Sequence, residues 1–120
     1  MNQIVSINAD RVELEPADYA SVATAGDPQA KMAKLCTAED GGWGSTVGIW
    51  TCEPCTLVSR VMIEETILVL EGEVRIALDD GTAVDLGVGG IAVLPRGKVA
   101  TWTVKTHYKE VFVLAGPAIS

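Results

Sequence analysis

The stretch ETILVLEGEVRIALDDG, residues 65–81, contains the clearest structural pattern in the chain. Its first part is an apolar, β-branched run that ends at Gly72. Its second part, from Glu73 to Leu78, alternates strictly between polar and apolar residues, as a half-buried strand does. Asp79-Asp80-Gly81 then forms a strong hairpin-turn sequence. The stretch therefore predicts two successive strands and a tight turn.

Similar patterns lie on both sides of this stretch. We expect further strands at residues 47–51, 56–63, 84–86, 91–94, 101–104 and 111–114. Shorter strand-like segments occupy 4–7 and 12–14, and Asp27-Pro28 has the composition of a helix start, which suggests a short helix from Gln29 to Leu35. Short strands with no long helix between them predict an antiparallel all-β domain, closed as a barrel or jelly roll or packed as a sandwich.

The composition indicates one domain with an aliphatic core. Of its 120 residues, 48% are hydrophobic, but only three Trp, two Tyr and one Phe are aromatic. Sixteen acidic and nine basic residues give a net charge of −7, which argues against nucleic acid or an anionic membrane surface as partner. No apolar run is long enough to span a bilayer, and the first residues do not have the pattern of a secretion signal. The three cysteines, an odd number, suit a reducing compartment, so we expect a cytoplasmic protein.

Two spaced motifs carry more information than the strand pattern. Glu65 is followed after six residues by Gly72. In the segment GGIAVLPRG, Gly89 is followed after five residues by Pro95, and Pro95 after one residue by Gly97. This arrangement resembles the two motifs of the cupin family, G-x5-H-x-H-x3,4-E-x6-G and G-x5-P-x-G-x2-H-x3-N.

A closer resemblance is to the small cupins grouped with ureidoglycine aminohydrolase. Five motifs typical of these proteins occur in order: GDP at 26–28, GIW at 48–50, CEP at 52–54, LEG at 70–72, and PRG at 95–97 with TWTV at 101–104. The resemblance implies an RmlC-like double-stranded β-helix, a jelly-roll barrel with a pocket along its axis. It also implies a strand at 31–37 instead of the helix. We divide the chain into an N-terminal strand or arm at 1–25 and a cupin domain at 26–120.

The sequence departs from the cupin motifs at the positions that hold a metal. Metal-binding cupins use two histidines and a glutamate from the first motif and a histidine from the second. The histidine positions of the first motif fall at Val58 and Arg60, or at Ser59 and Val61 with the shorter spacing, and that of the second motif at Ala100. Only Glu65 remains, and one carboxylate cannot supply the three or four ligands of a catalytic metal. We therefore expect no metal and no other cofactor.

Arg60 and Glu65 are the candidate ligand-binding pair. With the longer spacing, strand alternation places both on the inward face, where Arg60 would receive a ligand carboxylate and Glu65 would orient the ligand or accept its proton. Two alternatives remain open: a self-satisfied salt bridge, or an exposed pair with Glu64 pointing inward instead of Glu65. Trp50 and Trp102 are candidates for aromatic pocket walls or for plain core packing.

The sequence does not decide which of two residues occupies one further position of the resembling cupins. Small cupins of the resembling group carry a basic residue in their last strand, and Lys109 lies near it, whereas an offset of one residue would place Glu110 there.

The leading interpretation is a metal-independent cupin that binds a small organic acid or a related metabolite. The alternative is an enzyme of small-metabolite metabolism, either a ureidoglycine aminohydrolase-like hydrolase or an isomerase with Glu65 as its catalytic base. The fold alone does not decide between binding and catalysis. Because N-terminal segments of cupins commonly add to a neighbour's sheet and cover its open edge, we also expect a homodimer.

Overall fold

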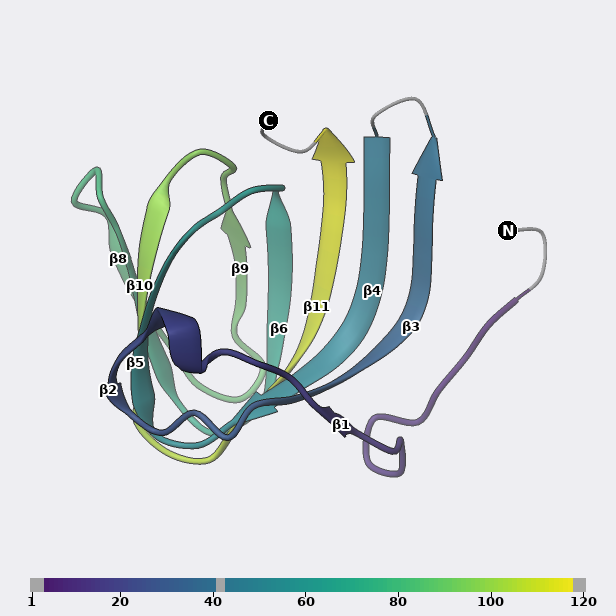
Figure 1. Cartoon of the computed structure of the whole chain (residues 1–120), viewed down its shortest axis with the longest axis horizontal. Coiled ribbons are helices and arrows are strands. Elements are labelled where there is room, and N and C mark those ends of the chain that lie inside the picture. The colour runs from purple at the N-terminus through teal and green to yellow at the C-terminus, as the bar shows by residue number, and fades with distance from the viewer. Residues whose placement is uncertain (1–3, 41–42, 118–120) are drawn as a thin grey trace.

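Figure 1 shows the computed structural model of the chain, in which two antiparallel sheets face each other. The structure describes residues 4–40 and 43–117. The larger sheet contains, in spatial order, β1 (Glu15–Pro16), β3 (Lys31–Asp40), β4 (Trp43–Cys52), β11 (Tyr108–Pro117), β6 (Glu65–Glu71) and β9 (Ile91–Leu94). The smaller sheet contains β2 (Ala23–Gly26), β5 (Cys55–Arg60), β10 (Val99–Val104), β7 (Val74–Leu78) and β8 (Ala83–Leu86).

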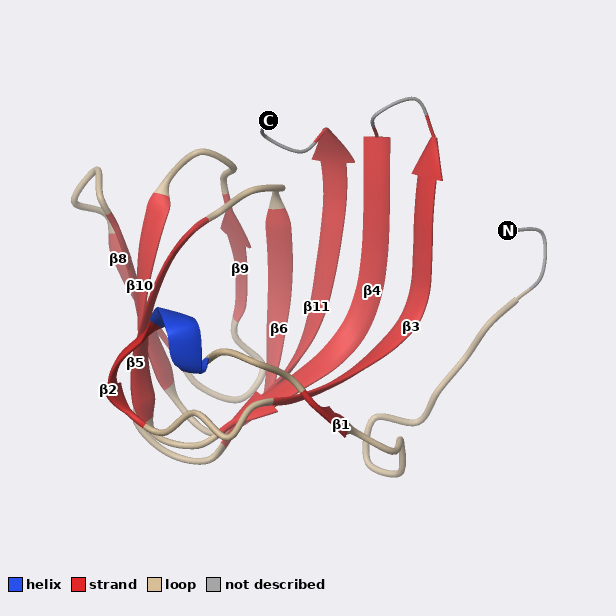
Figure 2. Cartoon of the chain, in the orientation of Figure 1, coloured by secondary structure: helices blue, strands red, loops and turns tan. Residues whose placement is uncertain are grey.

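The connections between these strands are those of a jelly roll. From β4 to β11 successive strands alternate between the two sheets, except for the β7–β8 hairpin. This path confirms the predicted double-stranded β-helix and the antiparallel all-β class. Among the described residues the only helix is the 3-10 turn η1 (Ala20–Val22), seen in blue in Figure 2, and no helix there is long and apolar enough to cross a membrane.

The strands predicted from residue 47 onward are all present, with ends that differ by a few residues. The short helix predicted from Gln29 to Leu35 is wrong, and the strand implied at 31–37 is confirmed as part of β3. Two local features exclude the helix. Gln29 has a φ of 42°, outside the helical region, and its N–H donates to Asp27 Oδ1 in a tight turn at 3.2 Å.

The strand-like segments at 4–7 and 12–14 do not form strands. The N–H groups of Arg11 and Val12 donate instead to the carbonyl oxygen of Asn8 in a turn. From Glu15 onward the predicted N-terminal arm joins the sheets of its own chain, because β1 pairs with β3 and β2 pairs with β5. The start of the described chain extends away from the barrel (Figure 1), whereas Val12 and Glu13 line a surface hollow together with Met32, Ala33 and Lys34 of β3.

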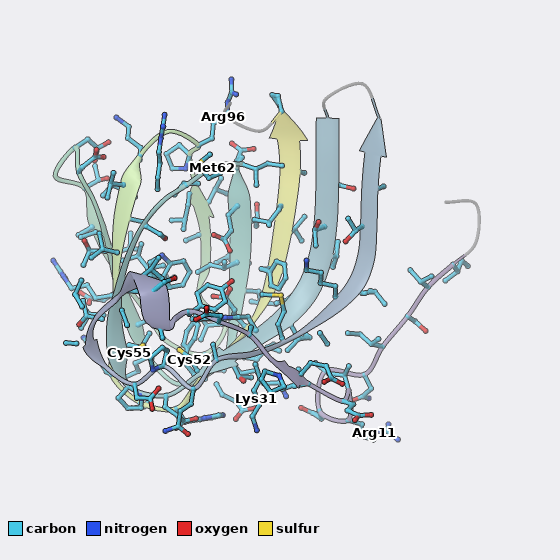
Figure 3. All side chains as sticks on the ribbon, viewed as in Figure 1. Arg11, Lys31, Cys52, Cys55, Met62 and Arg96 are labelled. Atoms are coloured by element: carbon cyan, nitrogen blue, oxygen red, sulfur yellow. The ribbon has the colours of Figure 1, made fainter. Side chains whose placement is uncertain are left out.

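The two ends of the barrel differ in packing. At the end where β6 stops and β11 begins, the interior is filled by residues that are at most 3% exposed: Cys52, Val69, Val74, Val104 and Tyr108. Figure 3 shows Cys52 and Cys55 at this end and Met62 and Arg96 at the opposite one. The packed end therefore forms the floor, and the space toward the other end is available to a ligand.

Gly48 shapes the wall above this floor. A Cβ atom added to Gly48 would lie 2.6 Å from Phe112 Cζ and 2.5 Å from the carbonyl oxygen of Ala33. Since real Cβ atoms do not approach other atoms so closely, any side chain at this position would displace the Phe112 ring or the neighbouring strand.

Gly48→Ala should therefore destabilise the fold by about 1–3 kcal/mol, the usual range for overpacking a filled interior. Gly87→Ala is the matched control, because a Cβ atom there meets nothing within 4 Å. Urea unfolding followed by circular dichroism measures both. Equal midpoints for the two variants would show that Gly48 makes no steric contribution.

Candidate functional site

The end of the barrel opposite the floor is hollow. A cavity of about 300 Å³ lies between the two sheets. Most of its wall is apolar or aromatic, and its polar residues other than the aromatic ones are few: Lys34, Thr46, Ser59, Glu65 and Glu110. A largely apolar pocket with a few convergent polar groups is the usual form of a small-molecule site.

An aromatic cluster separates the cavity from the packed floor. The ring of Trp50 packs edge-on against Tyr19 with centroids 5.2 Å apart, and against Trp102 and Tyr108 with centroids 6.0 Å apart. Such edge-to-face contacts fix ring orientations. Trp50 and Trp102 are therefore both core residues and cavity walls, so the two alternatives considered for them hold together.

The buried indole N–H of Trp50 has no hydrogen-bond partner within the described part of the chain. Buried donors in folded proteins are nearly always paired with protein or water. Because Trp50 lines the cavity, an acceptor atom on a bound molecule would complete this residue's hydrogen bonding.

Two carboxylates project into the cavity from neighbouring strands. In β11 alternation places Glu110, Phe112 and Leu114 on the inner face, and in β6 it places Glu65 on the same face. The Tyr108 hydroxyl donates to Glu110 Oε1 at 2.7 Å. The cavity thus holds two acidic side chains, of which Glu110 is anchored by a buried hydrogen bond.

Burial makes both carboxylates hard to ionise. Desolvation raises the pKa of Glu65 to about 7. Desolvation, together with repulsion from Glu65, raises the pKa of Glu110 well above the ordinary value, although the hydrogen bond from Tyr108 acts in the opposite direction. At neutral pH the pair is therefore partly protonated, and its charge depends on what enters the cavity.

Glu65 lies where the sequence predicted it, whereas Arg60 does not. Glu65 lines the cavity and Glu64 is exposed, which excludes the alternative in which Glu64 points inward. The inward orientation expected for Arg60 is wrong. In β5 Leu57 is buried, so alternation turns Ser59 into the cavity and leaves Arg60 exposed on the other face. The shorter motif spacing, with Ser59 and Val61, is the one that the structure has.

Arg60 and Glu65 consequently form no ion pair, as far as the described residues show. The structure brings Glu65 together with Trp50 and Trp102 in one cavity and leaves Arg60 outside it.

Glu110 and Lys34 are cavity residues that the sequence did not identify as such. The sequence left Lys109 and Glu110 open for one position, and the register of β11 against β6 shifts between these two residues. Glu110 faces the cavity, whereas the Lys109 ammonium lies 3.6 Å from Glu71 Oε2. Alternation within one strand could have indicated Glu110, but it could not show that β6 places Glu65 in the same cavity.

The metal positions of the cupin motif do not fit a metal. They are occupied by Ser59, Val61, Ala100 and Glu65, a set with a single strong ligand. No group of three His, Cys, Asp or Glu side chains suitable for a metal occurs in residues 4–40 and 43–117.

Cys52 and Cys55 are buried free thiols at the floor. Burial raises the pKa of both thiols above the ordinary value, and in Cys52 their mutual interaction adds to the effect. Because the thiolate is the reactive form, this environment favours a packing role.

A double-stranded β-helix that encloses a pocket between its sheets defines a cupin. The family of EutQ-like cupin domains matches residues 40–112, more than half of the chain, and the chain belongs to this family. A comparison with curated proteins gives no match.

Solved structures show the same fold at low identity. The putative ethanolamine utilization protein Q of Salmonella typhimurium is 22% identical, with 75% of this chain and 71% of that chain covered and a TM-score of 0.62. The EutQ protein of Clostridium difficile is 18% identical, with 93% and 80% covered and a TM-score of 0.70. The Cnp3 cupin domain of Schizosaccharomyces pombe is 16% identical, with 95% and 75% covered and a TM-score of 0.70.

The buried carboxylates predict how stability depends on pH. The pKa of Glu65 is about 7 in the folded protein, against an ordinary value of 4.5, so between these values the folded state binds more protons than the unfolded one. Stability should therefore fall as pH rises from about 4.5 to 7. Glu65→Gln should flatten this decline and raise the melting temperature at pH 8, while the exposed neighbour variant Glu64→Gln should not. Parallel pH profiles of Glu65→Gln and the unsubstituted protein would contradict a desolvated Glu65.

Proposed function

We propose that this cupin binds a small organic amine in its barrel cavity without a metal ion. The observation that supports this proposal is the pair of carboxylates, Glu65 and Glu110, inside an aromatic-walled cavity. An ammonium group between them would supply the positive charge that both carboxylates need in order to ionise. The aromatic faces of Trp50 and Trp102 would add cation–π attraction.

The small organic acid expected from the sequence has less support. That expectation depended on an inward Arg60, which lies outside the cavity. An anion would meet Glu65 and Glu110 at short range and increase their repulsion. A small metabolite as ligand remains the proposal, with a cationic group in place of an acidic one.

The energetic cost of the site supports a functional origin. Two buried carboxylates destabilise a fold compared with apolar residues of similar size, and strongly perturbed pairs in a cavity are typical of functional sites. The unpaired indole N–H of Trp50 in the same wall is a second group that the protein alone does not satisfy.

Amine binding should be measurable with butylamine, and butan-1-ol is the uncharged control of the same shape. We expect butylamine to quench or shift Trp fluorescence at pH 8 and to bind at least about tenfold tighter than butan-1-ol, the amount that one charge-assisted hydrogen bond supplies. Glu65→Gln should remove most of this difference, because it removes a negative charge without changing the size of the side chain.

The same titration should depend on pH. The titratable groups that line the cavity with Glu65 are Glu110, Tyr19 and, at the rim, Lys34. Tyr108, in the floor, donates its hydroxyl hydrogen to Glu110. Since the pKa of Glu65 is about 7, amine affinity should increase from pH 6 to pH 8 as its proton leaves. Binding that is independent of pH, or butyrate that binds tighter than butylamine, would refute the proposed amine site.

Catalysis is the second candidate, favoured by one specific observation. A carboxylate with a pKa of about 7 is well matched to general acid–base work at neutral pH. Glu65 would then be the base of an isomerase, or part of a hydrolase like ureidoglycine aminohydrolase. An isomerase of this kind would exchange solvent deuterium into the C–H position that Glu65 deprotonates, and Glu65→Gln would abolish the exchange but retain some binding.

We also propose a homodimer and a cytoplasmic location. Ile4, Val5 and Ile7 are 97%, 44% and 40% exposed on the segment that leaves the barrel, and a second copy would cover them. The buried free thiols Cys52 and Cys55 suit a reducing compartment.

The dimer should appear in light scattering as twice the chain mass at micromolar concentration. A double variant, Ile4→Asp with Ile7→Asp, should shift the equilibrium toward monomer, because it replaces the exposed apolar side chains with charges. Val84→Asp, on an exposed strand of the barrel, is the matched control. A monomer mass for the unsubstituted chain would exclude the dimer.

A further inference from the structure

Lys34 is a positive side chain that the proposed amine site does not use. It lies on β3 opposite Gly48, on the same inner face as Met32 opposite Trp50, and it lines the cavity. Immediately after Lys34 the register of β3 against β4 shifts. Because a bulge re-aims the side chains beside it, this local feature sets where Lys34 stands relative to the cavity.

The position of Lys34 in the sheet places it at the rim. The two-residue strand β1 pairs with β3 only at Lys31 and Met32, so beyond these residues β3 is the free edge of the larger sheet. Lys34 is exposed, and it forms no ion pair in the portion of the chain that the structure describes. Its ammonium is thus available to an anionic group that enters the cavity from this side.

The cavity therefore has a positive side chain at one side, on β3, and two acidic side chains at the other, on β11 and β6. Glu110 and Glu65 lie two and three strands away from β3 in the sheet, which corresponds to about 10 and 14 Å at ordinary strand spacing. A Lys and a Glu side chain that reach toward each other occupy a large part of that span. The remaining gap suits a ligand of a few carbon atoms that carries opposite charges at its two ends.

We infer that the cavity selects a small zwitterion, an amino acid whose ammonium group lies between Glu65 and Glu110 and whose carboxylate pairs with Lys34 at the rim. This inference rests on the proposed amine-binding function and adds the second charge of the ligand. It also accounts for how an acidic group can be bound in a cavity with two carboxylates, because the acid is held at the opposite side from them.

Three groups other than Lys34 would contact the same ligand and restrict its structure. The Phe112 ring, which lies where a side chain on Gly48 would be, forms the apolar surface between the charged ends. Thr46 lines the cavity one inward position beyond Gly48 on β4 and offers a hydroxyl near the rim. Trp50 contributes its unpaired N–H from the wall. The chain between the two charges should accordingly be aliphatic and unbranched.

The test compares matched probes by isothermal titration calorimetry at pH 8. The zwitterions are glycine, 3-aminopropanoate, 4-aminobutanoate, 5-aminopentanoate and 6-aminohexanoate, and each is paired with the alkylamine that has the same number of carbon atoms. We expect one length in the series to bind at least tenfold tighter than its alkylamine. No advantage for any zwitterion over its alkylamine overturns the inference while leaving amine binding intact.

Substitution of Lys34 is the second part of the experiment. Lys34→Met keeps an unbranched side chain of similar bulk and removes the charged ammonium, so the affinity ratio of the best zwitterion to its alkylamine should fall to about one. Lys31→Met is the matched control, since Lys31 lies on the same strand but faces away from the cavity and is labelled at the far end of the barrel in Figure 3. It should leave the ratio unchanged.

The outcomes separate the two proposals. A ratio that survives Lys34→Met, or that falls equally in Lys31→Met, overturns the assignment of Lys34 as the carboxylate partner. If neither the alkylamines nor the zwitterions bind, the proposed amine function fails and the zwitterion with it.

Discussion

Glu65 and Glu110 share one cavity on adjacent strands, and the free energy of keeping two carboxyl groups out of water constrains the rest of the site. Desolvation raises the pKa of both groups, and their mutual repulsion opposes simultaneous ionisation. The protein relieves part of this with the hydrogen bond from Tyr108 to Glu110. The rest of this unfavourable free energy is removed when a carboxylate takes up a proton or when a positive group enters the cavity. Selection for stability alone would favour apolar residues at these positions.

The scaffold explains why the two carboxylates meet. A packed floor and an aromatic cluster close one end of the barrel, and the alternation of β6 and β11 then directs each second side chain into the space above. Phe112 takes the space beside Gly48. The cavity is thus a consequence of close packing around a few fixed rings, which holds the acidic side chains in place before any ligand arrives.

Much of the fold could be predicted from local pattern, because turns and alternation are properties of short segments. The β7–β8 hairpin and the inward position of Glu65 followed in this way. The prediction that Arg60 points inward was wrong because it depended on the longer of two motif spacings. The two spacings differ by one residue, and a shift of one residue reverses the face of a strand on which a side chain lies. Glu110 remained ambiguous for the same reason, since the irregularity beside Lys109 is not visible in sequence. The prediction of a helix from Gln29 was wrong because strand pairing with β4 overrides a local helix-start pattern.

The resemblance to solved cupins at 16–22% identity carries the fold only, so the chemistry of the cavity has to come from this chain's own side chains.

The most direct measurement is a pH titration of the Glu side-chain carboxyl carbons by ¹³C NMR in the ligand-free protein, with Glu65→Gln and Glu110→Gln used to assign the two resonances. If the two carboxylates share a desolvated cavity, both should titrate above the ordinary range, with Glu65 near pH 7, and Glu65→Gln should lower the apparent pKa of Glu110 because a repulsive neighbour is removed. Ordinary titration of both groups near pH 4.3, with no effect of either substitution on the other, would show that the carboxylates are solvated and uncoupled, and the proposed site would have no physical basis.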